Sequence, residues 1–181
     1  MISTKPAFGL LELLVVIAIM ALLLTIAVPQ FSSFIPRYQR TQFFNRLNAL
    51  VQAGVLRSLK NKKFHTITFD LEKKLIILEE WSEAEKTKKP ISHESSLTKP
   101  CPIPNNIEIK QIFIEKFDEI GKYLGNKKAA RVWFFISGEG KTQAVIINAI
   151  DQKNNDNQQA ISLVLNPFSG QFELYDSFQK P

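Results

Sequence analysis

Residues 8–28 read FGLLELLVVIAIMALLLTIAV, an apolar run of 21 residues that holds one charge, Glu12. Only seven residues, MISTKPA, precede the run. A helix rises about 1.5 Å per residue, so a helix of this length covers roughly 30 Å, which matches the hydrocarbon core of a bilayer. The run is therefore predicted to be a helix long enough to span a membrane.

Glu12 separates the interpretations of this run. The run is too long for an ordinary secretory signal, whose apolar stretch holds roughly 7–15 residues, although Thr25-Ile26-Ala27 is a passable cleavage site. A plain membrane anchor fits the length, but a carboxylate near the centre of a spanning helix costs on the order of 2–3 kcal/mol. Glu12 lies one turn from the end of the run, at headgroup depth, where this cost is small. A plain anchor still has no use for a carboxylate.

The residues around the run resemble the amino terminus of type IV pilins and of the pseudopilins of type II secretion systems. Those families have a short basic leader ending in a small residue, then Phe, then Glu at the fifth position of the mature chain. Lys5, Ala7, Phe8 and Glu12 keep this spacing, and Pro29 falls where the families usually place a helix-perturbing proline. The leader departs from the families in ending in Ala rather than Gly.

The resemblance implies that residues 1–7 are a leader peptide, which a prepilin peptidase removes between Ala7 and Phe8, and that the new amino terminus at Phe8 is N-methylated. It also implies that residues 8–28 are a transmembrane helix in the inner membrane, with the carboxy-terminal head in the periplasm. In a filament of packed helices, Glu12 would face the terminal amine of a neighbouring subunit. A buried carboxylate paired with an ammonium is tolerable and fixes register, so Glu12 is the predicted assembly residue.

Beyond the run, apolar residues recur at steps of three and four, which predicts an amphipathic continuation of the helix over residues 29–62. Pro29 and Pro36 each remove a backbone donor, so we expect helix kinks at both. Arg46 and Lys60 fall off the apolar stripe and are expected to face solvent. The stripe consists of Phe31, Phe34, Ile35, Tyr38, Phe43, Phe44, Leu47, Leu50, Val51, Val55 and Leu59.

From residue 63 onward the period shortens to two, which predicts a β-rich head over residues 63–181. Residues 82–106 are predicted to be a long loop, because they lack periodicity and hold four prolines. One long helix followed by antiparallel hairpins is typical of an α+β fold in which the helix stripe packs on one sheet face. Hairpins are expected at 64–70 with 74–81, at 131–137 with 143–148 and at 160–165 with 171–175, with a further strand at 107–117.

Cysteine content and net charge limit the classes of protein and of binding partner that fit this sequence. The single cysteine, Cys101, rules out an intramolecular disulfide, and the resemblance makes this an argument against a major type IV pilin, which usually has a carboxy-terminal cysteine pair. Cys101 is interpreted as a small apolar filler, with a reactive thiol or intermolecular bridge as the alternative.

The net charge is +6, but the basic residues are scattered, so no nucleic-acid partner is expected. Arg37 and Arg40 follow the run, so the positive-inside rule does not favour a periplasmic head, and the topology rests on the resemblance.

The head offers no pattern typical of an enzyme, a cofactor site or a metal site. The two histidines, His65 and His93, lie in a predicted strand and in the predicted loop, and neither stands beside Cys101. Asp151, Asp156 and the asparagines between them are oxygen donors suited to calcium, but their spacing matches no known calcium loop. We therefore expect no catalytic residue, no cofactor and no metal.

The order of one helix and three hairpins looks like that of the H-type minor pseudopilins. The favoured hypothesis is a structural minor pseudopilin of a type II secretion system, processed by the prepilin peptidase and assembled with other pseudopilins. It would lie near the tip of a short periplasmic filament that drives protein export across the outer membrane. A minor pilin of a type IV pilus, active in adhesion or DNA uptake, is the alternative in the same superfamily. A membrane-anchored periplasmic enzyme or binding domain is the hypothesis from a different class.

Overall fold

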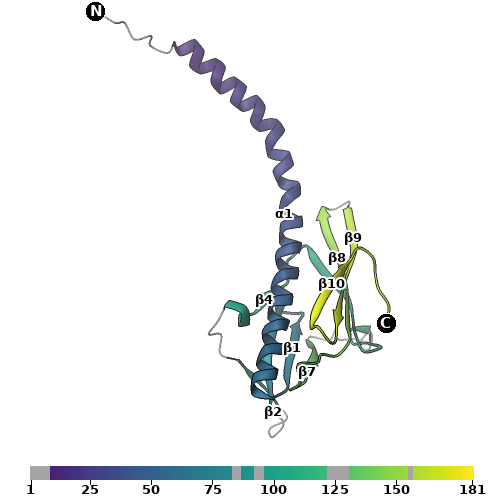
Figure 1. Cartoon of the computed structure of the whole chain (residues 1–181). Helices are drawn as coiled ribbons and strands as arrows, with labels where there is room; N and C mark the ends of the chain where they lie inside the picture. The colour runs from purple at the N-terminus through teal and green to yellow at the C-terminus, as the bar shows by residue number, and fades with distance from the viewer. Residues whose placement is uncertain (1–8, 83–86, 92–95, 122–130, 155–156) are drawn as a thin grey trace, which may run out of the picture. The chain divides into compact units, whose positions relative to one another are not determined.

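The computed structural model describes residues 9–82, 87–91, 96–121, 131–154 and 157–181. The chain divides into two compact units, Met1–Tyr38 and Gln39–Pro181. A single helix, α1 (Leu10–Asn61), contributes to both units, and every strand lies in the second (Figure 1). The predicted α+β fold, a long amino-terminal helix with an antiparallel β head, is confirmed.

The head contains two antiparallel sheets, whereas one was expected. The first sheet has the order β3-β2-β1-β7, with β4 paired to β2 beside β3. The second sheet has the order β10-β9-β8-β5-β6. The first sheet comprises β1 (His65–Asp70), β2 (Leu75–Ser82), β3 (Thr87–Pro90), β4 (Cys101–Pro102) and β7 (Arg131–Ile136). The second comprises β5 (Ile107–Ile114), β6 (Phe117–Asp118), β8 (Val145–Asn154), β9 (Asn157–Asn166) and β10 (Gln171–Tyr175).

The first and third predicted hairpins are confirmed, since β1 pairs with β2 and β9 pairs with β10. The hairpin predicted for 131–137 with 143–148 is wrong. Strand β7 pairs with β1 in the first sheet, and β8 pairs with β5 and β9 in the second. Among the described residues, the two segments are joined only at their ends next to the turn, by an isolated bridge between Ile136 and Thr142 and by hydrogen bonds between Phe135 and Gln143. The turn between β7 and β8 carries the chain from the first sheet to the second. The alternation of apolar and polar residues is the same whether two successive strands pair with each other or enter different sheets, so the sequence pattern cannot distinguish the two arrangements.

Two polar segments predicted to be irregular contain strands. Within 82–106, the predicted long loop, β3 and β4 pair with β2, and a short 3-10 helix, η1 (Ser96–Thr98), lies between them. The polar stretch after residue 150 extends β8 and begins β9, which pair along most of their length. Asp151 is buried there and its Oδ1 accepts a hydrogen bond from Asn106 Nδ2 at 2.7 Å. Polar side chains with partners inside the head allow these strands to form despite their composition.

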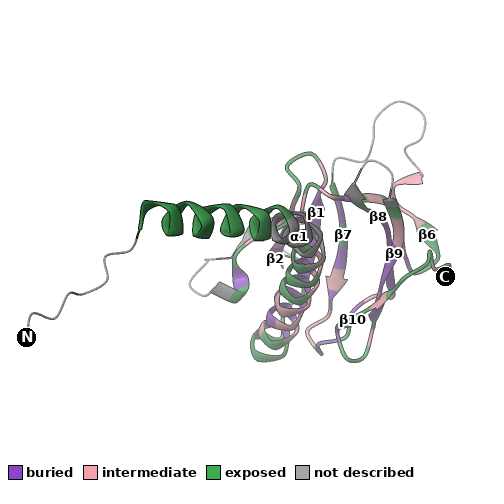
Figure 2. Ribbon diagram, turned by 90° about the horizontal axis from the view of Figure 1, so that it is seen from above, coloured by how far each residue is buried: buried purple, intermediate pink, exposed green. Residues whose placement is uncertain are grey.

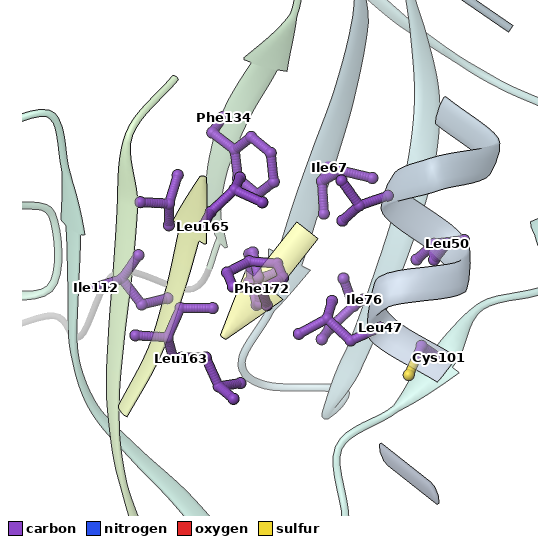
Figure 3. Close-up of a cluster of buried hydrophobic side chains, with 14 of the residues drawn as sticks. Leu47, Leu50, Ile67, Ile76, Cys101, Ile112, Phe134, Leu163, Leu165 and Phe172 are labelled. Atoms are coloured by element: carbon purple, nitrogen blue, oxygen red, sulfur yellow. The ribbon is translucent and has the colours of Figure 1, made fainter. Parts of the chain in front are cut away.

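The apolar stripe of α1 packs into the head between residues 43 and 53. Phe43, Leu47, Leu50 and Val51 are buried, and side chains from both sheets lie on the side of the helix that faces the core (Figure 3). The stripe ends sooner than predicted, because Leu59 is 41% exposed. The fully buried side chains of the two sheets include Ile67, Phe69, Ile76, Leu78, Ile112, Phe134, Ile136, Ile147, Ile161 and Leu165.

The helix ends where its apolar spacing stops. Asn61 is its last residue, and Lys62 adopts a left-handed backbone with a φ of 56°. The Lys62 amide donates to the Ser58 carbonyl at 2.8 Å, which satisfies one of the carbonyls left open at the helix terminus. This end turns the chain directly into β1.

Two polar side chains attach α1 to the edge of the second sheet. Strand β10 is an edge strand, and the side chain of Asn48 forms hydrogen bonds with both the backbone amide and the backbone carbonyl of Phe172. Asn48 Oδ1 accepts from the Phe172 amide at 2.7 Å, and its Nδ2 donates to the Phe172 carbonyl at 3.3 Å. Gln52 Nε2, one turn later, donates to the carbonyls of Ser169 and Gly170. The helix thus supplies to β10 the hydrogen bonds that a further strand would have made.

Replacing Asn48 with Ala should lower the free energy of unfolding by about 2 kcal/mol, because two backbone groups of Phe172 lose their partner. Asn45→Ala is the matched control, since Asn45 lies on the same helix and is exposed. Its effect should stay within about 0.5 kcal/mol. Chemical denaturation of the full chain in detergent measures both. Equal effects for the two variants would show that Asn48 does not hold β10 to the helix.

Candidate functional site

The amino-terminal turns of α1 carry the residues that the sequence singles out for assembly. The Gly9 carbonyl accepts the amide of Glu12 at 3.0 Å and the amide of Leu13 at 3.2 Å, which starts the helix. Glu12 lies in this first turn, where a carboxylate interacts favourably with the positive end of the helix dipole. Its side chain is exposed.

Residues 10–25 of α1 are exposed (Figure 2), and all of them except Glu12 and Thr25 are apolar. The exposed fractions of the large apolar side chains run from 46% at Val16 to 84% at Leu10. A helix that is apolar all round requires an apolar environment, either lipid or other helices. The exposed set consists of Leu10, Leu11, Leu13, Leu14, Val15, Val16, Ile17, Ile19, Met20, Leu22, Leu23 and Leu24.

The other predicted site residues are placed as follows. Ala7 and Phe8 lie outside the described residues, so cleavage and N-methylation there stay predictions. Pro29 and Pro36 lie within α1, whose helical assignment is continuous, and the kinks stay predictions. Searched over the described residues, the chain has no helix that combines the length and the hydropathy needed to cross a membrane.

His65 has a packing role at the junction of α1 and β1. Its side chain is fully buried, with Nδ1 2.8 Å from Ser58 Oγ and 3.2 Å from the Lys63 carbonyl oxygen. Burial lowers the pKa of His65 from 6.5, and the hydrogen bond to Lys63 opposes this shift in part. His93 lies outside the described residues.

Cys101 belongs to the core of the head. It is fully buried and pairs with Ile76 between β4 and β2. Burial raises the pKa of its thiol to about 11, although the nearby Arg46 opposes the shift. A buried thiol that stays protonated is a poor nucleophile. The geometry therefore favours the apolar filler over a reactive thiol or an intermolecular bridge.

The oxygen donors considered for calcium do not form a site in the part that the structure describes. Asp151 lies in β8 and is paired with Asn106, and Asp156 falls outside the described residues. Among the described side chains, no group of three or more His, Cys, Asp or Glu residues is placed to hold a metal ion.

Sequence reasoning missed an aromatic surface on the first sheet. Phe64, Trp81 and Phe135 border a surface cavity of about 540 Å³, and Trp133 is 42% exposed. Residues two apart on one strand point to the same face, so the alternation of Trp133 and Phe135 with buried residues was the available signal. The strand pairing that joins them to Phe64 and Trp81 is not visible in the sequence.

The comparisons with known proteins agree with the amino-terminal resemblance. Residues 3–28 match the family model described as the prokaryotic N-terminal methylation motif. A comparison with curated protein sequences gives no match.

Two similar solved structures are both of the minor pseudopilin EpsH from the type II secretion system of Vibrio cholerae. One is 11% identical with a TM-score of 0.47, and the match covers 78% of this chain and 93% of that one. The other is 9% identical with a TM-score of 0.48, covering 81% of this chain and 99% of that one.

The buried His65 predicts a pH dependence of stability. Because its folded pKa is lowered, the unfolded chain binds a proton at higher pH than the folded chain does. This contribution to stability is full above pH 6.5 and is lost as the pH falls through the lowered folded pKa. In His65→Gln the decline of stability as the pH falls below about 7.5 should flatten. Denaturation midpoints of both proteins measure it, and parallel curves would exclude His65 as the source.

Proposed function

We propose that this chain is a structural minor pseudopilin of a type II secretion system. It is stored in the inner membrane through residues 8–28, with its head in the periplasm. The prepilin peptidase removes residues 1–7, Phe8 is N-methylated, and the mature chain joins other pseudopilins in a short periplasmic filament that drives protein export. The chain acts by assembly and performs no catalysis.

The observation that carries the proposal is the match of residues 3–28 to the methylation motif, with Glu12 as the single charge among exposed apolar side chains. An all-round apolar helix is stable in lipid and equally stable when it is surrounded by similar helices. The Glu12 carboxylate lies in the first turn of this helix, close to the amine that processing would create at Phe8. Among packed helices a buried carboxylate is costly unless it is paired, so pairing with the amine of a neighbouring subunit would fix the axial register of the two helices. A plain anchor does not need this residue.

The single cysteine favours a minor subunit over a major type IV pilin, which usually has a carboxy-terminal cysteine pair. Cys101 is buried in the continuous core of the head and forms no disulfide. A minor pilin of a type IV pilus, active in adhesion or DNA uptake, is the second candidate, favoured by the same motif. The genes next to this one would separate the two, since secretion and pilus clusters encode different companion proteins.

Processing is tested by the intact mass of the chain recovered from membranes. We expect loss of residues 1–7 and the addition of one methyl group at Phe8. Ala7→Gly should preserve or speed the processing, while a bulky replacement, Ala7→Leu, should block it. A chain that keeps residues 1–7, or that is cut after Ala27, would exclude the proposal.

Assembly is tested by Glu12→Leu. The variant should insert into the membrane and lose its leader normally, while its incorporation into filaments falls on the order of tenfold or more, because the partner amine is left unpaired. Leu14→Val is the matched control within the same run and should assemble as the wild type does. Quantitative cross-linking to neighbouring pseudopilins measures incorporation. Wild-type incorporation of the Glu12 variant would remove the register role.

A further inference from the structure

The segment that follows β10 lies across the outer face of the second sheet. Residues 176–181, here called the strap, lie on the side of this sheet away from β1 (Figure 2). Gln179 of the strap forms hydrogen bonds with side chains of both β8 and β9. Because the sheet order is β10-β9-β8, the strap passes from the edge strand over the two strands next to it.

The strap covers two polar residues on the outer face. Asn148 of β8 and Ser162 of β9 lie opposite each other. Their strand neighbours Ile147 and Leu163 belong to the core, and successive residues of a strand point to opposite faces. Asn148 and Ser162 therefore point away from the core, yet they are only 1% and 0% exposed. Their burial follows from the strap, which lies over them.

Asn148 and Ser162 bind the backbone of the strap at one residue. The Gln179 amide donates to Asn148 Oδ1 at 3.2 Å and to Ser162 Oγ at 3.0 Å, and Asn148 Nδ2 donates to the Gln179 carbonyl at 3.0 Å. The Asn148 amide is itself oriented, because its Nδ2 also donates to Gln111 Oε1 at 3.1 Å and its Oδ1 accepts from the Ser162 hydroxyl. One side chain thus takes the place of a strand partner, as Asn48 does at β10.

The side chains of the strap add little to this contact. Phe178 is 43% exposed. Asp176 accepts a hydrogen bond from Gln159 Nε2 at 2.9 Å and lies 3.7 Å from Arg40 Nη1, but its side chain is 71% exposed. Ion pairs of exposed groups contribute little. The strap is therefore held chiefly through the backbone of Gln179, and its release uncovers little apolar surface.

We propose that the outer face around Asn148 and Ser162 is a docking site for an extended peptide segment, and that the strap of a second copy of this chain docks there in exchange for the chain's own. A strap from another copy has the same sequence and forms the same hydrogen bonds, so exchange requires no new contact. The chain's own strap is favoured by its high effective concentration, which a second copy held nearby also provides. The inference concerns the head alone and is independent of the proposed function.

Two full-length variants separate the docking site from its own occupant. Gln179→Pro removes the amide that donates to Asn148 and Ser162, so its strap should be released and its site left open. Gln179→Ala is the matched control, because it keeps this amide and loses only the side-chain hydrogen bonds to Ser177.

The first experiment titrates these chains, in a maltoside detergent, with the peptide Ac-DSFQKP-NH2, which repeats residues 176–181. NMR follows the Asn148 side-chain amide and the Ser162 backbone amide. Gln179→Pro should bind the peptide, whereas the wild type and Gln179→Ala, whose sites are occupied, should bind it at least about tenfold more weakly. Equal binding to the wild type and to Gln179→Pro would overturn the proposal.

Two methylated peptides test which backbone group is bound in the Gln179→Pro chain. Methylation of the peptide's Gln179 amide should weaken binding at least about tenfold, because the donor to Asn148 and Ser162 is lost. Methylation of the Phe178 amide, which has no partner among the described residues, should change binding less than about twofold. Equal affinities of the two peptides would exclude backbone recognition at Gln179.

Exchange between copies is tested by photo-crosslinking of two full chains in the same detergent. The donor carries Asn148→Asp, which removes a bond to its own strap, and Phe178→p-benzoylphenylalanine. Its cross-link to the second sheet of a Gln179→Pro acceptor should form at least about fivefold more than with an acceptor that carries Gln179→Pro and Asn148→Asp. Combining Gln179→Pro with Gln158→Glu, which adds the same charge at an exposed residue of β9, should leave the yield unchanged. Equal yields with all three acceptors would exclude exchange.

Discussion

The head depends on the close approach of α1 to the first sheet at Gly54. A Cβ atom at this position would lie 2.6 Å from Ile136 Cδ1 and 2.9 Å from Leu78 Cδ1, which is closer than side-chain carbons pack. The lack of a side chain at Gly54 lets the helix lie close to these two side chains, and a Cβ atom there would require their ends to shift. Leu47, Leu50 and Val51 of the same helix are buried in the core. On its other side the same segment meets β10 through Asn48 and Gln52. One helix thus contacts both sheets, whose buried side chains form one core.

The continuous helix divides its sequence between two kinds of environment. Its first described turns expose nearly every apolar side chain, while between residues 43 and 53 only one stripe is apolar and that stripe is buried. Each fully buried Leu or Val contributes about 1.5–3 kcal/mol in the head. The exposed residues add no such burial in the folded chain by itself. The buried core therefore lies in the second unit, and under the proposed function the exposed apolar residues of the helix would contact lipid or neighbouring helices.

The sequence predicts those parts of the fold that depend on local patterns. The helix, its end near Asn61 and the β1–β2 and β9–β10 hairpins follow from apolar spacing and from turn residues adjacent in the chain. The switch of β7 and β8 into different sheets does not, because the Gly138–Gly140 turn is equally suited to a hairpin. Residues distant in the sequence determine which sheet each strand joins, because β7 pairs with β1 whereas β8 pairs with β5 and β9. The burial of Asp151 in a strand is similarly decided by Asn106, 45 residues away.

The candidate functional residues likewise divide into those that a local sequence pattern identifies and those that only the folded structure brings together. Glu12 and the proposed leader are identified from consecutive residues, because residues 3–28 match one continuous motif. The aromatic cavity draws on β2, on β7, on Phe64 just before β1 and on the segments that follow β5 and β7, so no single stretch of sequence contains it. The same holds for the neighbouring contact in which the Lys88 ammonium lies 3.5 Å from the centroid of the Trp133 ring, because Lys88 belongs to β3 and Trp133 to β7. Local patterns cannot report such contacts, since strand pairing between distant segments brings the residues together.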